Sequence, residues 1–309
     1  MNTRNRFRLL PVSALLASAC ALAGCRSENV SVPPSGPVTL PPPPAAVSTS
    51  GRPPGTARAG VRATWKPGAS PHAPRVVRPV ANAALAAYPP STKLFDRGGK
   101  TAPTRVALTF DCCYSDVGVP LILQTLAEHH LHCTFFMAGF FCNHYPASAH
   151  AIADAGMELG NHSYTHPHFT KLDDEKVLDQ LDHAEDAIER ACGRGAKPLF
   201  RFPYGDSDRR TRQLVAETGY QPIHWTLDSL DSVGKPKSAD FVAQRIETRI
   251  KPGSITLMHV SCLESAKALP RILDYLEKNG YEVVPVSTLL LEQATTGQVQ
   301  PPKDKIRQD

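Results

Sequence analysis

The pattern of apolar and polar residues divides the chain into two parts. Residues 25–84 are rich in Pro, Ser, Gly and Ala and have little apolar periodicity. Such a composition cannot bury enough apolar surface to form a core, so we expect a disordered linker with polyproline II stretches. From residue 105 onward, short apolar runs of strand length alternate with amphipathic segments of helix length. We therefore place the folded domain at 85–296, followed by a disordered tail at 297–309.

The alternation of these runs predicts a parallel sheet, because strands separated by helices pair through crossover connections. In about 200 residues a closed or nearly closed barrel is the economical arrangement. We predict the α/β class and a distorted (β/α)7-type barrel. Ser207 and Gly219 suit the two ends of the expected helix over 209–218. The expected strands cover 105–111, 133–139, 158–162, 199–204, 221–227, 254–259 and 281–287, and the other expected helices cover 117–130, 173–191, 239–250 and 265–278.

The first 24 residues have the form of a secretory signal. Three arginines precede an apolar stretch too short to span a membrane, and small residues follow it. The segment LAGC, which ends at Cys25, resembles the lipobox of bacterial lipoproteins. That resemblance implies cleavage before Cys25, lipidation of its thiol and anchoring at the outer membrane or the cell surface, facing the wall. An ordinary signal peptide with an incidental cysteine is the alternative.

Charge is unevenly distributed. The whole chain carries +5, but residues 1–24 hold three arginines and no acid, and residues 25–84 hold seven basic residues and one acidic residue. The remainder, 85–309, is therefore −4. A mildly acidic domain argues against a nucleic-acid partner. The sequence gives no sign of the oligomeric state, and we treat the domain as a monomer.

Polar residues follow the expected strands at the edge where barrel enzymes place their chemistry. His162 and His166 are four apart, a spacing that suits a divalent metal, although it also occurs by chance. His168 follows Pro167, so we expect it to point elsewhere. Other expected strands end near Asp111, Arg201, Tyr204, Asp228, Asp231 and His259. Their convergence at one rim predicts a catalytic site.

These residues stand in ordered motifs. The segments TFD, HSYTH, RFPY and LMH appear in that order, together with DSLDS. The chain resembles the polysaccharide deacetylases, carbohydrate esterase family 4, over about residues 103–291. The family's Asp-x-x-Asp-Trp motif corresponds to DSLDS, with Ser232 in place of Trp. The resemblance implies a metal-dependent hydrolase that removes acetyl groups from N-acetylated sugars.

The resemblance also implies a role for each motif residue. A metal would lower the pKa of bound water and polarise the acetyl carbonyl. Zinc is the cation we expect, with cobalt or nickel as alternatives. The implied roles are: Asp111, general base; Arg201, its charge partner; His162 and His166, metal ligands; Tyr204, a backbone N–H for the oxyanion; His259, general acid; Asp231, the partner that raises the pKa of His259; and Leu257, the acetyl-methyl pocket.

One position departs from the family pattern. The family motif continues with a second aspartate, the third metal ligand, and here that position is Cys112. Three interpretations remain open: Cys112 binds the metal as a thiolate, the two histidines bind it with water alone, or Cys112 or Cys113 forms a disulfide. For a disulfide, the resemblance favours Cys113 with Cys262, because the last strands of the family barrel lie beside the first. Cys142 is another possible partner.

A branch of the family shares this departure. The peptidoglycan N-acetylmuramic acid deacetylases of the delta-lactam type also lack the second aspartate, and the segment HVSCLESAKAL (259–269) resembles theirs. The match around Tyr114 is loose, since Ser115 precedes the acidic Asp116. The resemblance implies a cell-wall glycan, peptidoglycan, as substrate. The alternatives are a catalytically impaired, glycan-binding lipoprotein and a deacetylase of an exopolysaccharide.

Overall fold

The computed structural model describes residues 85, 89–99 and 104–295, all of which belong to one compact unit over 67–309. The expected signal peptide at 1–24, the linker at 25–84 and the tail at 297–309 lie outside the described residues. Those three segments stay predictions. None of the helices in the described residues is long and apolar enough to cross a membrane.

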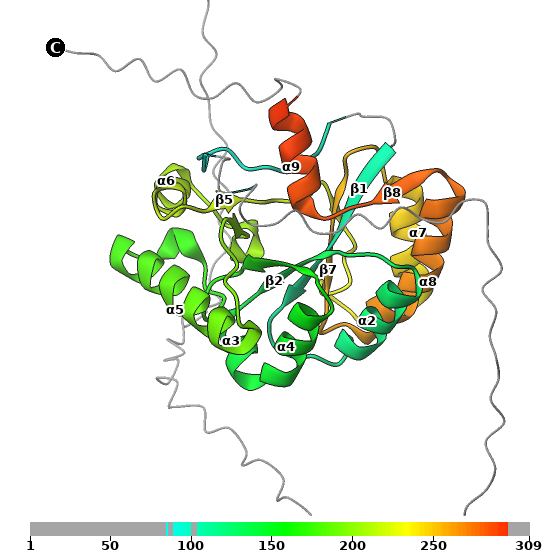
Figure 1. Cartoon of the computed structure of the whole chain (residues 1–309), viewed down its shortest axis with the longest axis horizontal. Helices are drawn as coiled ribbons and strands as arrows, with labels where there is room; N and C mark the ends of the chain where they lie inside the picture. Colours follow the sequence, from blue (N-terminus) through cyan, green and yellow to red (C-terminus); the bar gives the residue numbers. More distant parts are fainter. Residues whose placement is uncertain (1–84, 86–88, 100–103, 296–309) are drawn as a thin grey trace, which may run out of the picture. The chain divides into compact units, whose positions relative to one another are not determined.

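The described domain is built on a curled parallel sheet (Figure 1). The strands follow the order β5-β4-β3-β2-β1-β7-β6, and β8 pairs with the start of β1. Every paired strand runs parallel to its neighbour. This confirms the predicted α/β barrel class. The strands are β1 (Thr104–Cys112), β2 (Thr134–Met137), β3 (Glu158–Asn161), β4 (Leu199–Phe200), β5 (Gln221–Pro222), β6 (Leu227–Asp228), β7 (Ile255–His259) and β8 (Tyr281–Val283).

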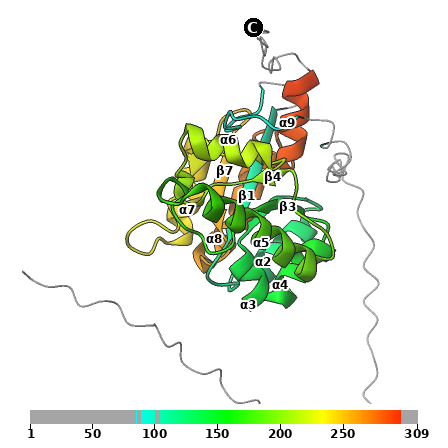
Figure 2. The same ribbon diagram turned by 90° about the vertical axis from the view of Figure 1, so that its left-hand side faces the viewer.

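Helices surround the sheet. In both views α9 lies at one end of the domain, and α3 and α4 lie at the other (Figures 1 and 2). The helices are α2 (Val119–Glu128), α3 (Gly139–His144), α4 (Pro146–Asp154), α5 (Asp174–Cys192), α6 (Arg209–Glu217), α7 (Ala239–Arg249), α8 (Leu263–Lys278) and α9 (Val286–Thr295). Short 3-10 turns occupy Phe169–Lys171 and Pro203–Gly205.

The central strand, β1, is buried on both faces from Val106 to Cys112. Its outward face and those of β2 and β7 pack against α2 and α8 in the main apolar core. Burial on both faces explains why the strand is a nearly continuous apolar run that ends in a polar residue. The register pairs Asp111 of β1 with His259 of β7, so the ends of two motif strands lie side by side.

One expected strand is in fact two. The run over 221–227 gives the two-residue strands β5 and β6, which stand at opposite edges of the sheet. The chain between them therefore crosses the opening of the barrel, and the sheet does not close there. The N-cap of helix α6 is Asp208, not Ser207 as expected: the Asp208 carboxylate accepts from the backbone N–H of Thr211, and the Thr211 hydroxyl accepts from the Asp208 N–H.

Helix α9 covers the amino-terminal ends of the strands. The buried carboxylate of Glu158, at the start of β3, accepts hydrogen bonds from the Thr134 hydroxyl (2.6 Å) and the Ser287 backbone N–H (3.2 Å). A carboxylate at this position satisfies unpaired N–H groups at the start of the helix and is favoured by the helix dipole. The expected strand over 281–287 therefore ends early, at Val283, and its last residues begin α9.

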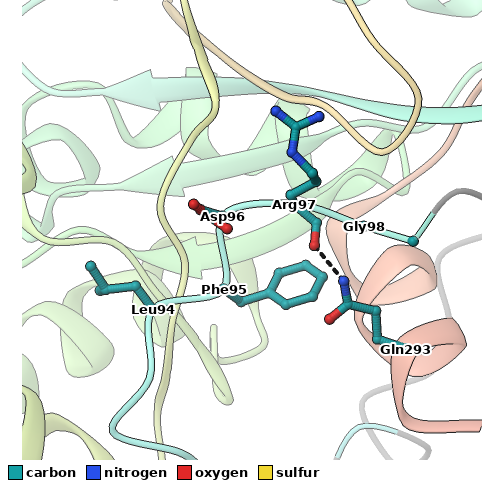
Figure 3. A pocket seen from close by; sticks show the side chains of 7 residues that line it. Leu94, Phe95, Asp96, Arg97, Gly98 and Gln293 are labelled. Carbon is teal, nitrogen blue, oxygen red and sulfur yellow. Dashed lines mark hydrogen bonds between the residues drawn. The ribbon is translucent and has the colours of Figure 1, made fainter. Parts of the chain in front are cut away.

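The segment before β1 lies against α9 at the same end. The Gln293 side-chain amide donates to the Arg97 carbonyl at 2.6 Å (Figure 3). Gly253 has a φ of +75°, and a Cβ there would lie 2.2 Å from the Gly98 carbonyl oxygen, so only glycine fits. Residues 94–99 and Gln293 line a cavity of about 450 Å³. It includes none of the predicted site residues, which lie at the opposite ends of the strands.

Candidate active site

The carboxyl ends of β1, β3, β4 and β7 bring the motif residues together. Asp111 ends the apolar part of β1, His162 follows β3, Arg201 follows β4, and His259 is the last residue of β7. Parallel strands end at the same edge of the sheet, so side chains far apart in sequence meet there. The Asp111 carboxylate is the common neighbour: it lies 2.7 Å from Arg201 Nη1 and 3.3 Å from His162 Nε2.

One group of at least three possible metal-ligating side chains is found in the described part of the chain. It consists of Cys113, His162 and His166, whose donor atoms all lie within 4.8 Å of one another. Nδ1 of His162 is 2.8 Å from the Arg201 carbonyl oxygen. That hydrogen bond places the proton on Nδ1 and leaves the Nε2 lone pair facing Asp111 and the cluster.

A tight loop holds the two histidines. Ser163 and His166 both have positive φ angles, 67° and 60°, which non-glycine residues rarely adopt. Hydrogen bonds within the loop support this geometry: the Asn161 side-chain oxygen accepts from the Ser163 N–H at 2.9 Å, and the Ser163 hydroxyl accepts from the His166 N–H at 3.0 Å. The i, i+4 histidines therefore meet through a loop, not through a turn of α-helix.

The third member of the cluster is Cys113, whereas one of the three open interpretations placed the third ligand at Cys112. The Cys112 thiol is fully buried and donates to the Phe110 carbonyl at 3.8 Å, and it is not part of the ligand cluster. Successive side chains along a strand point to opposite faces. Cys112, the last residue of β1, therefore points to the face opposite Asp111, whereas Cys113 follows the strand and its thiol lies with the two histidines.

The expected disulfides of this region are absent from the structure. All six cysteines of the described residues are free thiols. Cys113 lies with the two histidines and is not joined to Cys262. Cys142, the other expected partner, interacts with Cys192 instead.

Asp111 and Arg201 form a buried ion pair. Burial alone raises the pKa of Asp111, but the charge and hydrogen bond of Arg201, with the charges of His162 and His259, outweigh it and hold the pKa below its usual value. Nη1 of Arg201 also donates to the Thr109 hydroxyl at 2.8 Å. The guanidinium lies over the Phe136 ring, 4.0 Å from its centroid. Asp111 is therefore an ionised and oriented carboxylate at neutral pH.

His259 and Asp231 form the second pair. Nδ1 of His259 lies 2.7 Å from Asp231 Oδ1, and the backbone N–H of His259 donates to Oδ2 at 2.9 Å. Burial lowers the pKa of His259, but the hydrogen bond and charge of Asp231 outweigh this and raise the pKa above its usual value. The imidazole keeps its proton to higher pH than a free histidine does.

The cluster itself is neutral without a metal. Burial is the main reason that the pKa of His162 is lowered and that of His166 falls to about 3. Burial, together with the charge of Asp111, raises the pKa of the Cys113 thiol well above its usual value. Two unprotonated imidazoles and one thiol that can lose its proton to a metal form a donor set that fits a divalent cation.

The remaining predicted residues border this centre. Tyr204 has a φ of 59°, and its exposed ring stands 4.5 Å, edge on, from that of His166. Leu257 is buried two residues before His259 and so shares its face of β7. His168 stacks on Tyr204 and lies 3.2 Å from Asp206 Oδ2, away from the cluster, as expected. The proposed roles of Tyr204 and Leu257 stay predictions.

Sequence analysis missed several supporting residues. The Ser265 hydroxyl donates to Asp231 Oδ2 at 2.5 Å, and the Ser232 hydroxyl lies 3.4 Å from His259 Nε2. The Tyr114 hydroxyl lies 3.5 Å from His166 Nδ1. The position of Tyr114, three residues after Asp111, was a usable signal. Ser265 lies within the segment 259–269 noted above, but the sequence gave no sign that its hydroxyl reaches Asp231.

Comparisons with known proteins agree with this geometry. Residues 98–223 match a family model described as polysaccharide deacetylase. The chain is 31% identical over 157 residues to a chitooligosaccharide deacetylase of Azorhizobium caulinodans, covering 51% of this chain and 74% of that relative. It is 27% identical over 196 residues to the peptidoglycan-N-acetylmuramic acid deacetylase PdaA of Bacillus subtilis, covering 63% and 74%.

A solved structure of the same family is also similar to this chain. BA3943 of Bacillus anthracis, described as a CE4 family pseudoenzyme, is 31% identical, has a TM-score of 0.62 and covers 65% of this chain and 70% of its own. A mutant of that protein is described as having restored enzymatic activity. The motifs, the barrel and these similarities converge on one conclusion. The chain belongs to the polysaccharide deacetylase family, carbohydrate esterase family 4, and its similarity to the peptidoglycan and chitooligosaccharide deacetylases supports a hydrolase that acts on amide carbon–nitrogen bonds.

Proposed function

We propose that the protein is a metal-dependent de-N-acetylase that hydrolyses acetamido groups of a cell-wall glycan, peptidoglycan, and releases acetate. The observation that carries the proposal is that two ion pairs, each with one carboxylate, lie around one cluster of possible metal ligands. Asp111 with Arg201 supplies an ionised base, and Asp231 with His259 supplies a protonated acid. Amide hydrolysis needs both in one site.

Cys113, His162 and His166 would hold the cation. Zinc suits this mixture of nitrogen and sulfur donors, and cobalt or nickel would accept the same set. When bound, the cation polarises the acetyl carbonyl and makes a neighbouring water more acidic.

The residues of the chain then move protons and orient the substrate. Asp111 takes a proton from the attacking water, and Arg201 holds the carboxylate ionised and in position. As the carbon–nitrogen bond breaks, His259 gives its proton to the sugar nitrogen, which leaves as an amine. Asp231 fixes the tautomer and raises the pKa of His259. The Tyr204 N–H would face the oxyanion, and Leu257 would line the methyl pocket.

Peptidoglycan as the substrate rests on similarity to one branch of the family, seen in two ways. PdaA, a similar protein, is named a peptidoglycan-N-acetylmuramic acid deacetylase. The segment 259–269 resembles the same branch of the family. The predicted signal, the lipidated Cys25 and the long linker would place the domain within reach of the wall, as an exported lipoprotein.

Mass spectrometry of muropeptides tests this function. Purified peptidoglycan treated with the zinc-loaded protein should yield muropeptides that lack one acetyl group, and the position of the loss identifies the sugar. Chitooligosaccharide and an acetylated exopolysaccharide serve as comparison substrates. Deacetylation of the exopolysaccharide with intact muropeptides would contradict the assignment to peptidoglycan.

A glycan-binding protein without turnover is the second candidate. Two observations favour it: the similarity to a structure described as a pseudoenzyme, and the loss of the family's second aspartate, whose position is taken by Cys112. It predicts that the protein sediments with peptidoglycan but releases no acetate with any of the three metals. Acetate release by the unmodified protein would exclude this candidate.

A further inference from the structure

Two cysteines outside the candidate site lie together between α3 and α5. Cys142 is buried within α3, and Cys192 is the half-buried last residue of α5. Both thiols contact the sulfur of Met137, at 3.9 and 3.8 Å. Each thiol also shifts the pKa of the other, and the Cys192 thiol lies 3.5 Å from the Ala149 carbonyl oxygen. The two sulfurs are therefore neighbours, although 49 residues separate them in the sequence.

The two helices approach each other closely at this place. A Cβ on Gly139, at the start of α3, would lie 2.9 Å from the Cα of Ala184 in α5. Such spacing requires glycine and brings the two backbones into contact. The two helices are therefore in direct contact three residues before Cys142 in α3 and eight residues before Cys192 in α5.

The two thiols differ in their chemistry. The hydrogen bond from Cys142, assisted by the charge of Arg194, lowers the pKa of Cys192 against the effect of burial. The same hydrogen bond, with burial, raises the pKa of Cys142. The more accessible thiol thus forms the thiolate more readily, and its buried neighbour stays protonated until that thiolate has reacted.

We propose that Cys142 and Cys192 are a dithiol–disulfide site that closes by exchange with a disulfide-bearing oxidant. The Cys192 thiolate attacks a sulfur of the oxidant, forms a mixed disulfide and releases one thiol. Cys142 then loses its proton and attacks the Cys192 sulfur, which closes the internal disulfide and releases the second thiol. Two cysteine thiols are oxidised, and one disulfide of the oxidant is reduced.

The bond would tie together the two helices that hold the metal-ligand loop. From α3, the backbone N–H groups of Gly139 and Phe140 donate to the carbonyls of Ser163 (3.0 Å) and Tyr164 (2.8 Å). From α5, the Gln180 side-chain oxygen accepts from the N–H groups of Tyr164 (3.0 Å) and Thr165 (2.8 Å). A disulfide between these helices restrains the loop between His162 and His166 from both sides.

Peptide mapping across a series of glutathione redox buffers tests the proposal. Free thiols are alkylated after an acid quench, and linked peptides are identified by mass. In oxidising buffer the Cys142 and Cys192 peptides should be joined, with a mass about 2 Da below the sum of the reduced pair. Two free thiols at these positions in that buffer, or a bond from either to a different cysteine, would overturn it.

Single variants test the order of the steps. In Cys142→Ser the remaining Cys192 should carry a glutathione adduct, whereas in Cys192→Ser the buried Cys142 should stay free. Equal adduct formation on both would contradict the assignment of Cys192 as the attacking thiol. If either variant does not fold, the peptide map of the unmodified protein still decides whether the bond forms.

Thermal unfolding gives a second readout. Oxidation should raise the melting temperature of the unmodified protein by roughly 5–10 °C, because a disulfide over this span restricts the unfolded chain. Cys262→Ser is the matched control, since it removes another half-buried thiol and should still respond to oxidant. A stabilisation that persists in Cys142→Ser would show that the bond lies elsewhere.

Discussion

His259 is bound to Asp231 twice, through its ring and through its backbone. Nδ1 lies 2.7 Å from Oδ1, and the His259 N–H donates to Oδ2 at 2.9 Å. One carboxylate therefore fixes both the position of the strand end and the tautomer of the ring, so that Nε2 is the nitrogen that faces outward. Ser265, which donates to the same Oδ2, holds the carboxylate in place.

The pH dependence of turnover should show this pair. His259 must be protonated to act as an acid, and its pKa is raised above the usual value. Activity should hold through neutral pH and fall as the pH rises past that raised pKa. In Asp231→Asn the charge is lost, the pKa drops, and the alkaline limb of the kcat/KM profile should move to lower pH. If the alkaline limb stays at the same pH and kcat is reduced equally at every pH, Asp231 has a structural role only.

Removal of the proposed base should stop turnover without unfolding the domain. In Asp111→Asn the amide keeps the size of the side chain but cannot take a proton from water. We expect acetate release to fall by roughly 10²–10⁴-fold. The metal content and the melting temperature report separately on the cluster and the fold. Retention of more than about a tenth of the activity would contradict the assignment of the base.

Cobalt spectroscopy can identify the sulfur ligand. If Cys113 binds the cation, the cobalt-loaded protein should show a thiolate-to-cobalt charge-transfer band, and Cys113→Ser should lose it. Cys112→Ala is the matched control, because its thiol points into the core and its loss should leave the band in place. A band that disappears in Cys112→Ala and survives in Cys113→Ser would restore Cys112 as the ligand.

The close contact between α3 and α5 should be sensitive to a single methyl group. A Cβ on Gly139 would lie 2.4 Å from the Tyr164 ring and 2.9 Å from the Ala184 backbone. We expect Gly139→Ala to lower the free energy of unfolding by about 1–3 kcal/mol, and to weaken zinc binding because Tyr164 lies in the ligand loop.

A matched glycine separates this clash from a general backbone effect. Gly234 has a φ of +69° and would meet no atom within 4 Å, so Gly234→Ala carries only the cost of its conformation, about 1 kcal/mol. Zinc affinity should be unchanged in that variant. Chemical denaturation and zinc titration of both variants measure the difference, and equal zinc affinities in the two would remove the proposed link between α3 and the loop.

The sequence predicted most of the strands and helices because the strands are clear apolar runs. The long apolar run of β1 and the polar residues that end β1, β4 and β7 indicated both the sheet and the edge at which the site lies. Helices α3 and α4 were missed, because Pro146 divides the segment 139–154 into two pieces too short to show a helical period. Helix α9 follows β8 almost directly, and its apolar start continued the strand-like run.

The third ligand of the cluster shows a different limit of prediction from the sequence. Placing Cys112 at the metal followed the family motif residue by residue. Alternation along β1 places Cys112 on the face opposite Asp111, which leaves Cys113 as the thiol that reaches the histidines. The partners from distant segments, Ser265 above all, could not be predicted, because they depend on how α8 returns against the loop of Asp231.

Acetate release during metal titration tests the central claim most directly. The metal-stripped protein is incubated with peptidoglycan, and zinc is added in steps while acetate is measured. The account predicts no release without metal, and release that rises until about one cation is bound per chain, in parallel with occupancy of the cluster. Full release by the stripped protein, or none after one equivalent of zinc, cobalt or nickel has bound, would contradict it.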